Sequence, residues 1–169
     1  PAKIYTEGVL DYLEKARQAG KIRYIGFTGH HLTTTHLEMI ERGFHWDTIQ
    51  MPLSVMDYHF RSFQQRVLGK AVEKEMGILA MKTMADGRFF GKNIRLEDVQ
   101  WETGNPIVPD KLSIKEALYF VWSLPVSVLI TGAENEDLIK EKINIVEKSL
   151  ERKDGQIREL EEILQEAER

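Results

Sequence analysis

Residues 62–82 read SFQQRVLGKAVEKEMGILAMK, a stretch in which one expected helix leads directly into one expected strand. Ser62 and Gln65 have the spacing of a helix-capping box, and apolar residues then recur at intervals of four, as on one face of a helix. The following run, 77–81, is short, apolar and opened by a glycine, which is typical of a strand. The apolar helix positions are Phe63, Val67 and Ala71.

The same alternation of helix and strand continues on both sides of this stretch. Further capping signals are Thr35 with Glu38, Ser113 with Glu116, and Asn135 alone. A long polar segment, 83–112, interrupts the alternation, and loops of such length are usually functional or mobile. The expected strands are 23–28, 48–53, 77–81 and 126–130, and the other expected helices are 7–19, 33–43, 114–124, 135–150 and 159–169.

Four successive strand–helix units predict an α/β fold with a parallel sheet and right-handed crossovers. The almost continuous apolar run 126–130 favours a strand that is buried on both faces. Two architectures fit: an open doubly wound sheet, or part of a (β/α)₈ barrel. A complete barrel typically takes about 250 residues and eight strands, and this sequence of 169 residues has too few of both.

Composition excludes several classes of function. The 23 Lys and Arg residues are scattered among 27 Asp and Glu residues, which argues against a nucleic-acid partner and against a basic membrane-binding patch. No run approaches the roughly 18 apolar residues of a membrane span. The chain has no cysteine, so disulfides and thiolate metal sites are excluded, and the histidine spacing does not suggest a zinc helix. We expect a cytoplasmic protein without a metal site.

Polar residues at the carboxyl ends of parallel strands are where α/β proteins place their sites. Gln50 lies inside the apolar run 48–53, where a buried amide is either satisfied by backbone or faces a ligand with matching groups. Gly132 opens a strand-to-helix turn that is able to hold a phosphate, although many such turns carry a glycine. Lys82 follows the strand 77–81 and is either an ordinary lysine or a Schiff-base nucleophile.

Four segments together resemble the aldo/keto reductase family. They match, in order and spacing, the fifth to eighth strands of that family, so the resemblance runs from about residue 7 to residue 150. It implies a parallel (β/α) half-barrel of four strand–helix units, the C-terminal half of a TIM (β/α)₈ barrel, over residues 1–150, with an amphipathic helix in 151–169. The segments are GKIRYIGFTGH (20–30), DTIQMPLS (47–54), GILAMK (77–82) and VLITG (128–132).

The resemblance implies a site for NADPH or NADH and assigns roles to individual positions. Thr28 and Gly29 replace a Ser–Asn pair that usually meets the nicotinamide carboxamide, and Gln50 matches the glutamine that binds the same group. Met81 replaces an aromatic residue that often stacks on the nicotinamide, and a thioether is also able to cover a ring face. Lys82 and Thr83 begin the loop over the pyrophosphate, whereas Gly132 and Ala133 fall at the adenosine phosphate.

The adenosine end departs from the family pattern. Glu134 stands where a basic residue often holds the 2′-phosphate of NADP, and it would repel that group. Leu138 and Lys142 replace polar residues that commonly hold the adenosine, although Lys142 is still able to serve a phosphate. The cofactor is therefore expected to be NADP or NAD.

The resemblance places the catalytic Tyr, Asp, Lys and His of the family on the first four strands, outside the matched segments. None of the five tyrosines lies in the motif of the catalytic Tyr, so no catalytic residue is assigned. We expect the cofactor-binding segment of a carbonyl reductase that is inactive alone. Two alternatives are a non-catalytic half-barrel that assembles with itself or with an N-terminal half-barrel chain, and a lyase that uses Lys82. The five tyrosines are Tyr5, Tyr12, Tyr24, Tyr58 and Tyr119.

Overall fold

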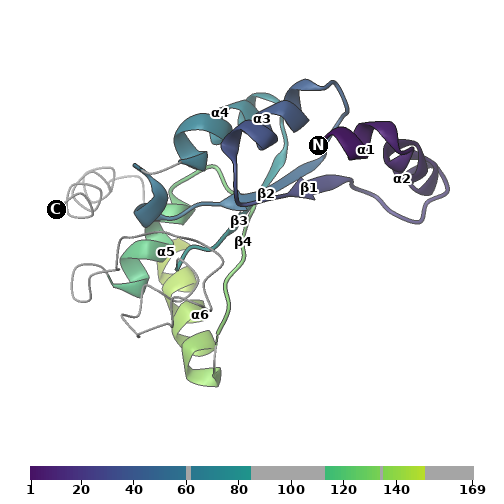
Figure 1. The fold of residues 1–169 in the computed structure, drawn as a ribbon. Helices are drawn as coiled ribbons and strands as arrows, with labels where there is room; N and C mark the ends of the chain where they lie inside the picture. Colours follow the sequence, from purple (N-terminus) through teal and green to yellow (C-terminus); the bar gives the residue numbers. More distant parts are fainter. Residues whose placement is uncertain (60–61, 85–112, 134, 151–169) are drawn as a thin grey trace, which may run out of the picture.

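The computed structural model describes residues 1–59, 62–84, 113–133 and 135–150. Its centre is a four-stranded sheet in the order β1-β2-β3-β4, in which every neighbouring pair is parallel (Figure 1). The strand order follows the chain order, so each crossover returns to the adjacent position, as in a barrel. The strands are β1 (Gly26–Thr28), β2 (Thr48–Pro52), β3 (Gly77–Met81) and β4 (Val128–Leu129).

The two faces of the sheet differ sharply in burial. One face carries Ile49, Ile78 and, two residues further along each strand, Met51 and Ala80; all four are almost fully buried against the helices. The register places Thr28, Gln50, Leu79 and Val128 side by side on the other face, where each is half-buried or exposed. Because neighbouring side chains of a strand point to opposite faces, one face is the core, and the described residues cover the other face only in part.

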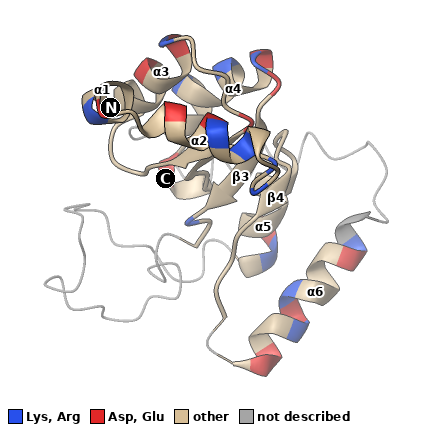
Figure 2. Ribbon diagram, turned by 90° about the vertical axis from the view of Figure 1, so that its right-hand side faces the viewer, with Lys and Arg blue, Asp and Glu red and all other residues tan. Residues whose placement is uncertain are grey.

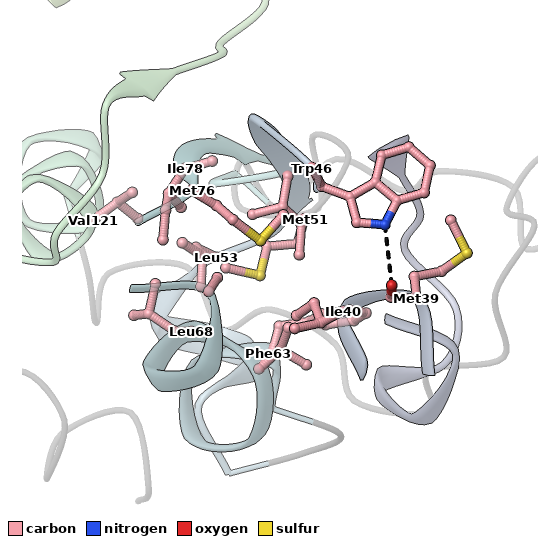
Figure 3. Packing of buried hydrophobic residues seen from close by; sticks show 14 of the residues in the cluster. Met39, Ile40, Trp46, Met51, Leu53, Phe63, Leu68, Met76, Ile78 and Val121 are labelled. Atoms are coloured by element: carbon pink, nitrogen blue, oxygen red, sulfur yellow. Dashed lines mark hydrogen bonds between the residues drawn. The ribbon is translucent and has the colours of Figure 1, made fainter. Parts of the chain in front are cut away.

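The core lies between β2, β3 and the helices that follow β1 and β2. These helices are α3 (Thr33–Glu41) and a π-helical turn, Gln64–Leu68, that continues into α4 (Gly69–Glu73). Figure 3 shows that Phe63 and Leu68 face Leu53 in this core. The indole Nε1 of Trp46 donates a hydrogen bond to the Met39 carbonyl at 3.0 Å. A buried indole that has a hydrogen-bond partner adds apolar area without an unsatisfied donor. The centre of the sheet is therefore well packed.

The amino-terminal segment contains the expected helix 7–19, observed as 9–18, and a second helix before it that was not predicted. They are α1 (Ala2–Thr6) and α2 (Val9–Gln18), and Gly8 between them has a left-handed φ of 70° that breaks the helix. Below β1, the Asp47 carboxylate accepts hydrogen bonds from the Ile25 amide at 2.7 Å and from Arg17 at 3.3 Å. This carboxylate ties α2 to the start of the sheet.

The carboxyl-terminal elements form a second, smaller packing unit. Helices α5 (Ile114–Trp122) and α6 (Glu136–Leu150) meet through Ala117, Leu118 and Ile145. In Figure 2, α6 stands beside the sheet with charged residues of both signs along its length. Contrary to the prediction that 126–130 is buried on both faces, Val128 and Ile130 are 50% and 41% exposed. Within the described residues, the face of β4 that carries Val128 is therefore largely open.

The helix caps agree in part with the sequence. The Ser113–Glu116 capping box is present in both directions, and Asn135 Oδ1 accepts from the Leu138 amide at 2.9 Å, so both predicted starts are confirmed. The proposed Thr35–Glu38 box is wrong because α3 begins two residues before Thr35 and its N-cap provides no side-chain hydrogen bond. The Ser62–Gln65 box is half formed: Ser62 accepts from the Gln65 amide, but the Gln65 side chain donates to the Tyr58 carbonyl. The expected helix 159–169 and most of the segment 83–112 lie outside the described residues.

Candidate cofactor-binding site

The carboxyl ends of β1 and β2 bring three of the predicted residues together. Thr28 and Gln50 are register partners, and the Gly29 amide donates to the Gln50 carbonyl at 3.3 Å. Thr28 is exposed, whereas Gly29 and Gln50 are half-buried. A hydroxyl and a primary amide thus stand next to each other on the face of the sheet opposite to the core, toward the end where α/β proteins place their sites.

Met81, at the end of β3, contacts the Gln50 side chain. The Gln50 Nε2 donates to Met81 Sδ at 3.4 Å, and this is its one hydrogen bond with a described residue. A thioether sulfur is a weak acceptor, so the amide keeps most of its hydrogen-bonding capacity for a stronger partner. This geometry favours the ligand-binding interpretation of Gln50 over that of an amide satisfied by backbone.

The chain turns sharply after β3. Lys82 adopts a left-handed φ of 59°, which is uncommon for a residue with a side chain and clusters at functional sites. Lys82 is only half-buried and follows the strand rather than belonging to it. Thr83 is 2% exposed, and its Oγ1 has no hydrogen-bond partner among the described residues. An unsatisfied buried hydroxyl costs about 1–3 kcal/mol, so a partner for Thr83 would stabilise this turn.

The remaining predicted residues form a separate group at the turn between β4 and α6. Gly132 and Ala133 are exposed there, and Lys142 reaches back from α6 so that its Nζ donates to Thr131 Oγ1 at 2.9 Å and to the Gly132 carbonyl. Lys142 is 7% exposed, and it forms no ion pair within the described part of the chain. A buried ammonium with neutral partners alone favours a nearby anion. Glu134, predicted to oppose a 2′-phosphate, lies outside the described residues.

One buried residue beside the site was not singled out by the sequence as a site residue. His36 of α3 is 2% exposed and lies directly behind Gly29, where a Cβ atom would come within 2.6 Å of its Cε1. The ring lines a cavity of ≈ 200 Å³ together with Phe27, Thr28 and Ile4 of α1. In the sequence, His36 is one of five histidines without metal spacing, and only its helical position facing the core would have marked it. Neither Gln50 nor Met81 lines this cavity.

Burial lowers the pKa of His36 below its ordinary value of 6.5, and a nearby His30 acts in the same direction. The backbone of Leu32, Gln50 and Gly29 opposes this shift. Nδ1 lies 3.3 Å from the Leu32 carbonyl, whereas Nε2 finds no acceptor in hydrogen-bonding geometry among the described residues. His36 is therefore neutral at neutral pH. Elsewhere in the described residues, no three His, Asp or Glu side chains come together as metal ligands.

The successive parallel strands, the helices on one face and the polar strand ends define a (β/α)-barrel type of protein. The model of the aldo/keto reductase family matches residues 2–165 of the sequence, and the chain belongs to that family. This finding confirms the family that the four segments indicated.

Solved structures give the same fold. The chain superposes on an aldo-keto reductase from Bacillus halodurans in its holo form with a TM-score of 0.65 and 16% identity, covering 94% of this chain and 54% of that one. The apo form of the same reductase gives a TM-score of 0.62 and 19% identity, covering 93% of this chain and 55% of that one. The chain thus spans about half the length of these relatives, and its four-stranded sheet corresponds to part of their barrel. No curated protein sequence matches it.

The described residues also bear on membrane association. None of the helices that they form has both the length and the low polarity needed to cross a bilayer.

Proposed function

We propose that this chain provides the nicotinamide-dinucleotide side of a carbonyl reductase, with the proton donor supplied by a complementary set of four strands. The observation that carries the proposal is the contact between Gln50 Nε2 and Met81 Sδ, next to Thr28, on the face of the sheet opposite to the core. An amide that is weakly satisfied and a polarizable side chain together fit the carboxamide and the ring face of a nicotinamide. Family membership supports the same conclusion.

The other predicted residues fit the rest of such a cofactor. The buried Thr83 hydroxyl and the half-buried Lys82 are suited to the pyrophosphate, and the buried Lys142 with the exposed turn at Gly132 and Ala133 suits the adenosine phosphate. When bound, the dinucleotide supplies a hydride. The contribution of this chain is to bind the cofactor and to orient the nicotinamide face.

A titration of the 169-residue chain against NADPH and NADH, followed by the fluorescence of the reduced nicotinamide, tests this proposal. We expect saturable binding of one or both, and about a tenfold weaker affinity for Gln50→Ala, since one or two hydrogen bonds of about 1 kcal/mol each are lost. Gln18→Ala is the matched control, because Gln18 is an exposed glutamine at the end of α2. Absence of binding to the unaltered chain, or equal affinity of Gln50→Ala, would contradict the proposal.

The chain alone is proposed to be inactive. A positioned general acid typically contributes about 10²–10⁴-fold to a rate, and no tyrosine here matches the family's proton-donor motif. We therefore expect the pure chain to oxidise NADPH or NADH at the background rate with any member of a broad panel of aldehydes and ketones. Turnover above background would show that the chain contains its own proton donor.

A second candidate function is assembly without catalysis. Apolar side chains are exposed at β4, namely Val128 and Ile130, and on α6, namely Ile139 and Ile143. Each terminal strand of the sheet has only one neighbour among the described strands. Unpaired edges with apolar surface favour association with further strands. Mass measurement in solution, by light scattering, checks this candidate: a monomer over the micromolar range that binds no hydrophobic dye would count against it.

A further inference from the structure

We propose that His36 is a positioning residue for the nicotinamide end of this site: its ring, wedged behind Gly29, holds the turn after β1 against the backbone of Gln50. This inference rests on the proposed function only for the identity of the ligand. The arrangement of His36, Gly29 and Gln50 is a feature of the described structure in its own right.

The first step of the argument is steric. A Cβ atom on Gly29 would lie 2.6 Å from His36 Cε1, a distance that side chains do not tolerate. The imidazole therefore occupies the space that a side chain at position 29 would need. Because Gly29 in turn donates its amide to the Gln50 carbonyl at 3.3 Å, the ring, the turn and β2 form one contiguous packing unit.

The second step is that the ring itself is held from several sides. Its centroid lies 4.8 Å from Phe63 in an edge-to-face arrangement and 5.4 Å from Phe27. Nδ1 approaches the Leu32 carbonyl at 3.3 Å. Contacts with β1, with α3 itself and with the residue that precedes the π-helical turn leave the imidazole little freedom. A ring that is held in this way keeps Gly29 in its place.

The third step concerns charge. A neutral ring suits this apolar environment, whereas a protonated ring would bury a cation between two phenyl rings. Among the described groups on the elements packed against His36, His30 in the turn after β1 acts on the ring through its charge, and it also disfavours protonation. Acidification is therefore expected to displace the ring and to release the turn that follows Thr28.

Dinucleotide titrations of the full chain between pH 7.5 and pH 5 test the proposal. The affinity of the unaltered protein should fall as the pH is lowered over this range, by at most about tenfold per pH unit. His36→Phe keeps an aromatic ring without a titrating group, and its affinity should stay level over the same range. His45→Gln, which removes an exposed histidine at the opposite end of β2, should retain the pH dependence of the unaltered protein. A pH dependence that survives His36→Phe would overturn the role of His36.

Amide hydrogen exchange without any ligand separates this proposal from the proposed function. After correction for the intrinsic pH dependence of exchange, residues 26–32 should lose protection at pH 5 in the unaltered chain but not in His36→Phe. If the unaltered chain binds no dinucleotide yet shows this difference, the proposed function fails and the positioning role stands. If protection does not change with pH, the positioning role fails. Should His36→Phe not fold, Gly29→Ala serves instead and should open the same residues at every pH, because its Cβ displaces the ring.

Discussion

The centre of the sheet and its β4 edge are built from similar amino acids but reach very different degrees of burial. Ile78 in β3 is 1% exposed and is packed against helices on the core face, whereas Val128 in β4, which pairs with Leu79 on the opposite face, is 50% exposed. Figure 1 shows why: α3 and α4 lie together over the middle strands, while β4 lies at the margin of the sheet. The difference teaches that, within the described residues, the sheet has a well-packed core face and an edge strand with an exposed apolar side chain on the opposite face.

The largest expected loss of stability comes from shortening a buried side chain at the centre of the sheet. Ile78→Ala should lower the free energy of unfolding by about 2–5 kcal/mol, because it leaves a cavity among fully buried neighbours. Val128→Ala at the edge should change it by less than about 0.5 kcal/mol. Urea denaturation of both variants measures the contrast, and equal losses would mean that the edge is buried in solution.

An intermediate loss of stability is expected from a substitution at the contact between α2 and the sheet. Asp47→Ala should cost about 1–3 kcal/mol, because the Ile25 amide and Arg17 both lose the carboxylate oxygen that accepts their hydrogen bonds. The control is Glu73→Ala, which removes a carboxylate from an exposed pair with Lys70. The same urea experiment applies, and a control that costs as much as Asp47→Ala would contradict the role given to the Asp47 carboxylate.

A smaller effect is expected from acid. Since the folded-state pKa of His36 lies below 6.5, the unfolded chain binds more protons below that pH, and the free energy of unfolding should fall as the pH drops from 6.5. The slope that His36 adds cannot exceed about 1.4 kcal/mol per pH unit. His36→Phe should remove this part of the acid destabilisation, as measured by urea denaturation at pH 7 and pH 5.5. An unchanged slope in the variant would assign the acid sensitivity to other groups.

The smallest effect on stability should come from the apolar face of α6. Ile139→Lys replaces a side chain that is 50% exposed, so the free energy of unfolding should change by less than about 0.5 kcal/mol. The same substitution should reduce any self-association of the chain through α6, because it places a charge among exposed apolar side chains. Light scattering at matched concentrations checks this, and a larger assembly in the variant would show that association uses another surface.

The sequence was informative where local chemistry decides the structure. The strand 77–81 and the capping signals at Ser113 and Asn135 were predicted correctly, because hydrophobic run length and capping groups act within a few residues. The exposure of Val128 was not predictable in this way. An apolar run looks the same whether or not a second layer exists to cover it, and coverage depends on distant elements.

In the candidate site, too, some features were predictable from the sequence and others were not. Gln50 was noticeable because an amide interrupts an apolar run, and its place beside Thr28 follows from the pairing of β1 with β2. Its contact with Met81 and the location of His36 behind Gly29 depend on the register between strands and on the packing of α3, which no spacing along the chain encodes. The predicted cofactor contacts themselves remain predictions.

Amide hydrogen exchange of the full chain at neutral pH tests the contrast between centre and edge most directly. Local stability follows buried contacts and sheet position, so protection should be greatest in β2 and β3, and lower by orders of magnitude in β4 and the exposed turns of α6. Equal protection of β3 and β4 would contradict the account, because it would mean that the edge of the sheet is already covered.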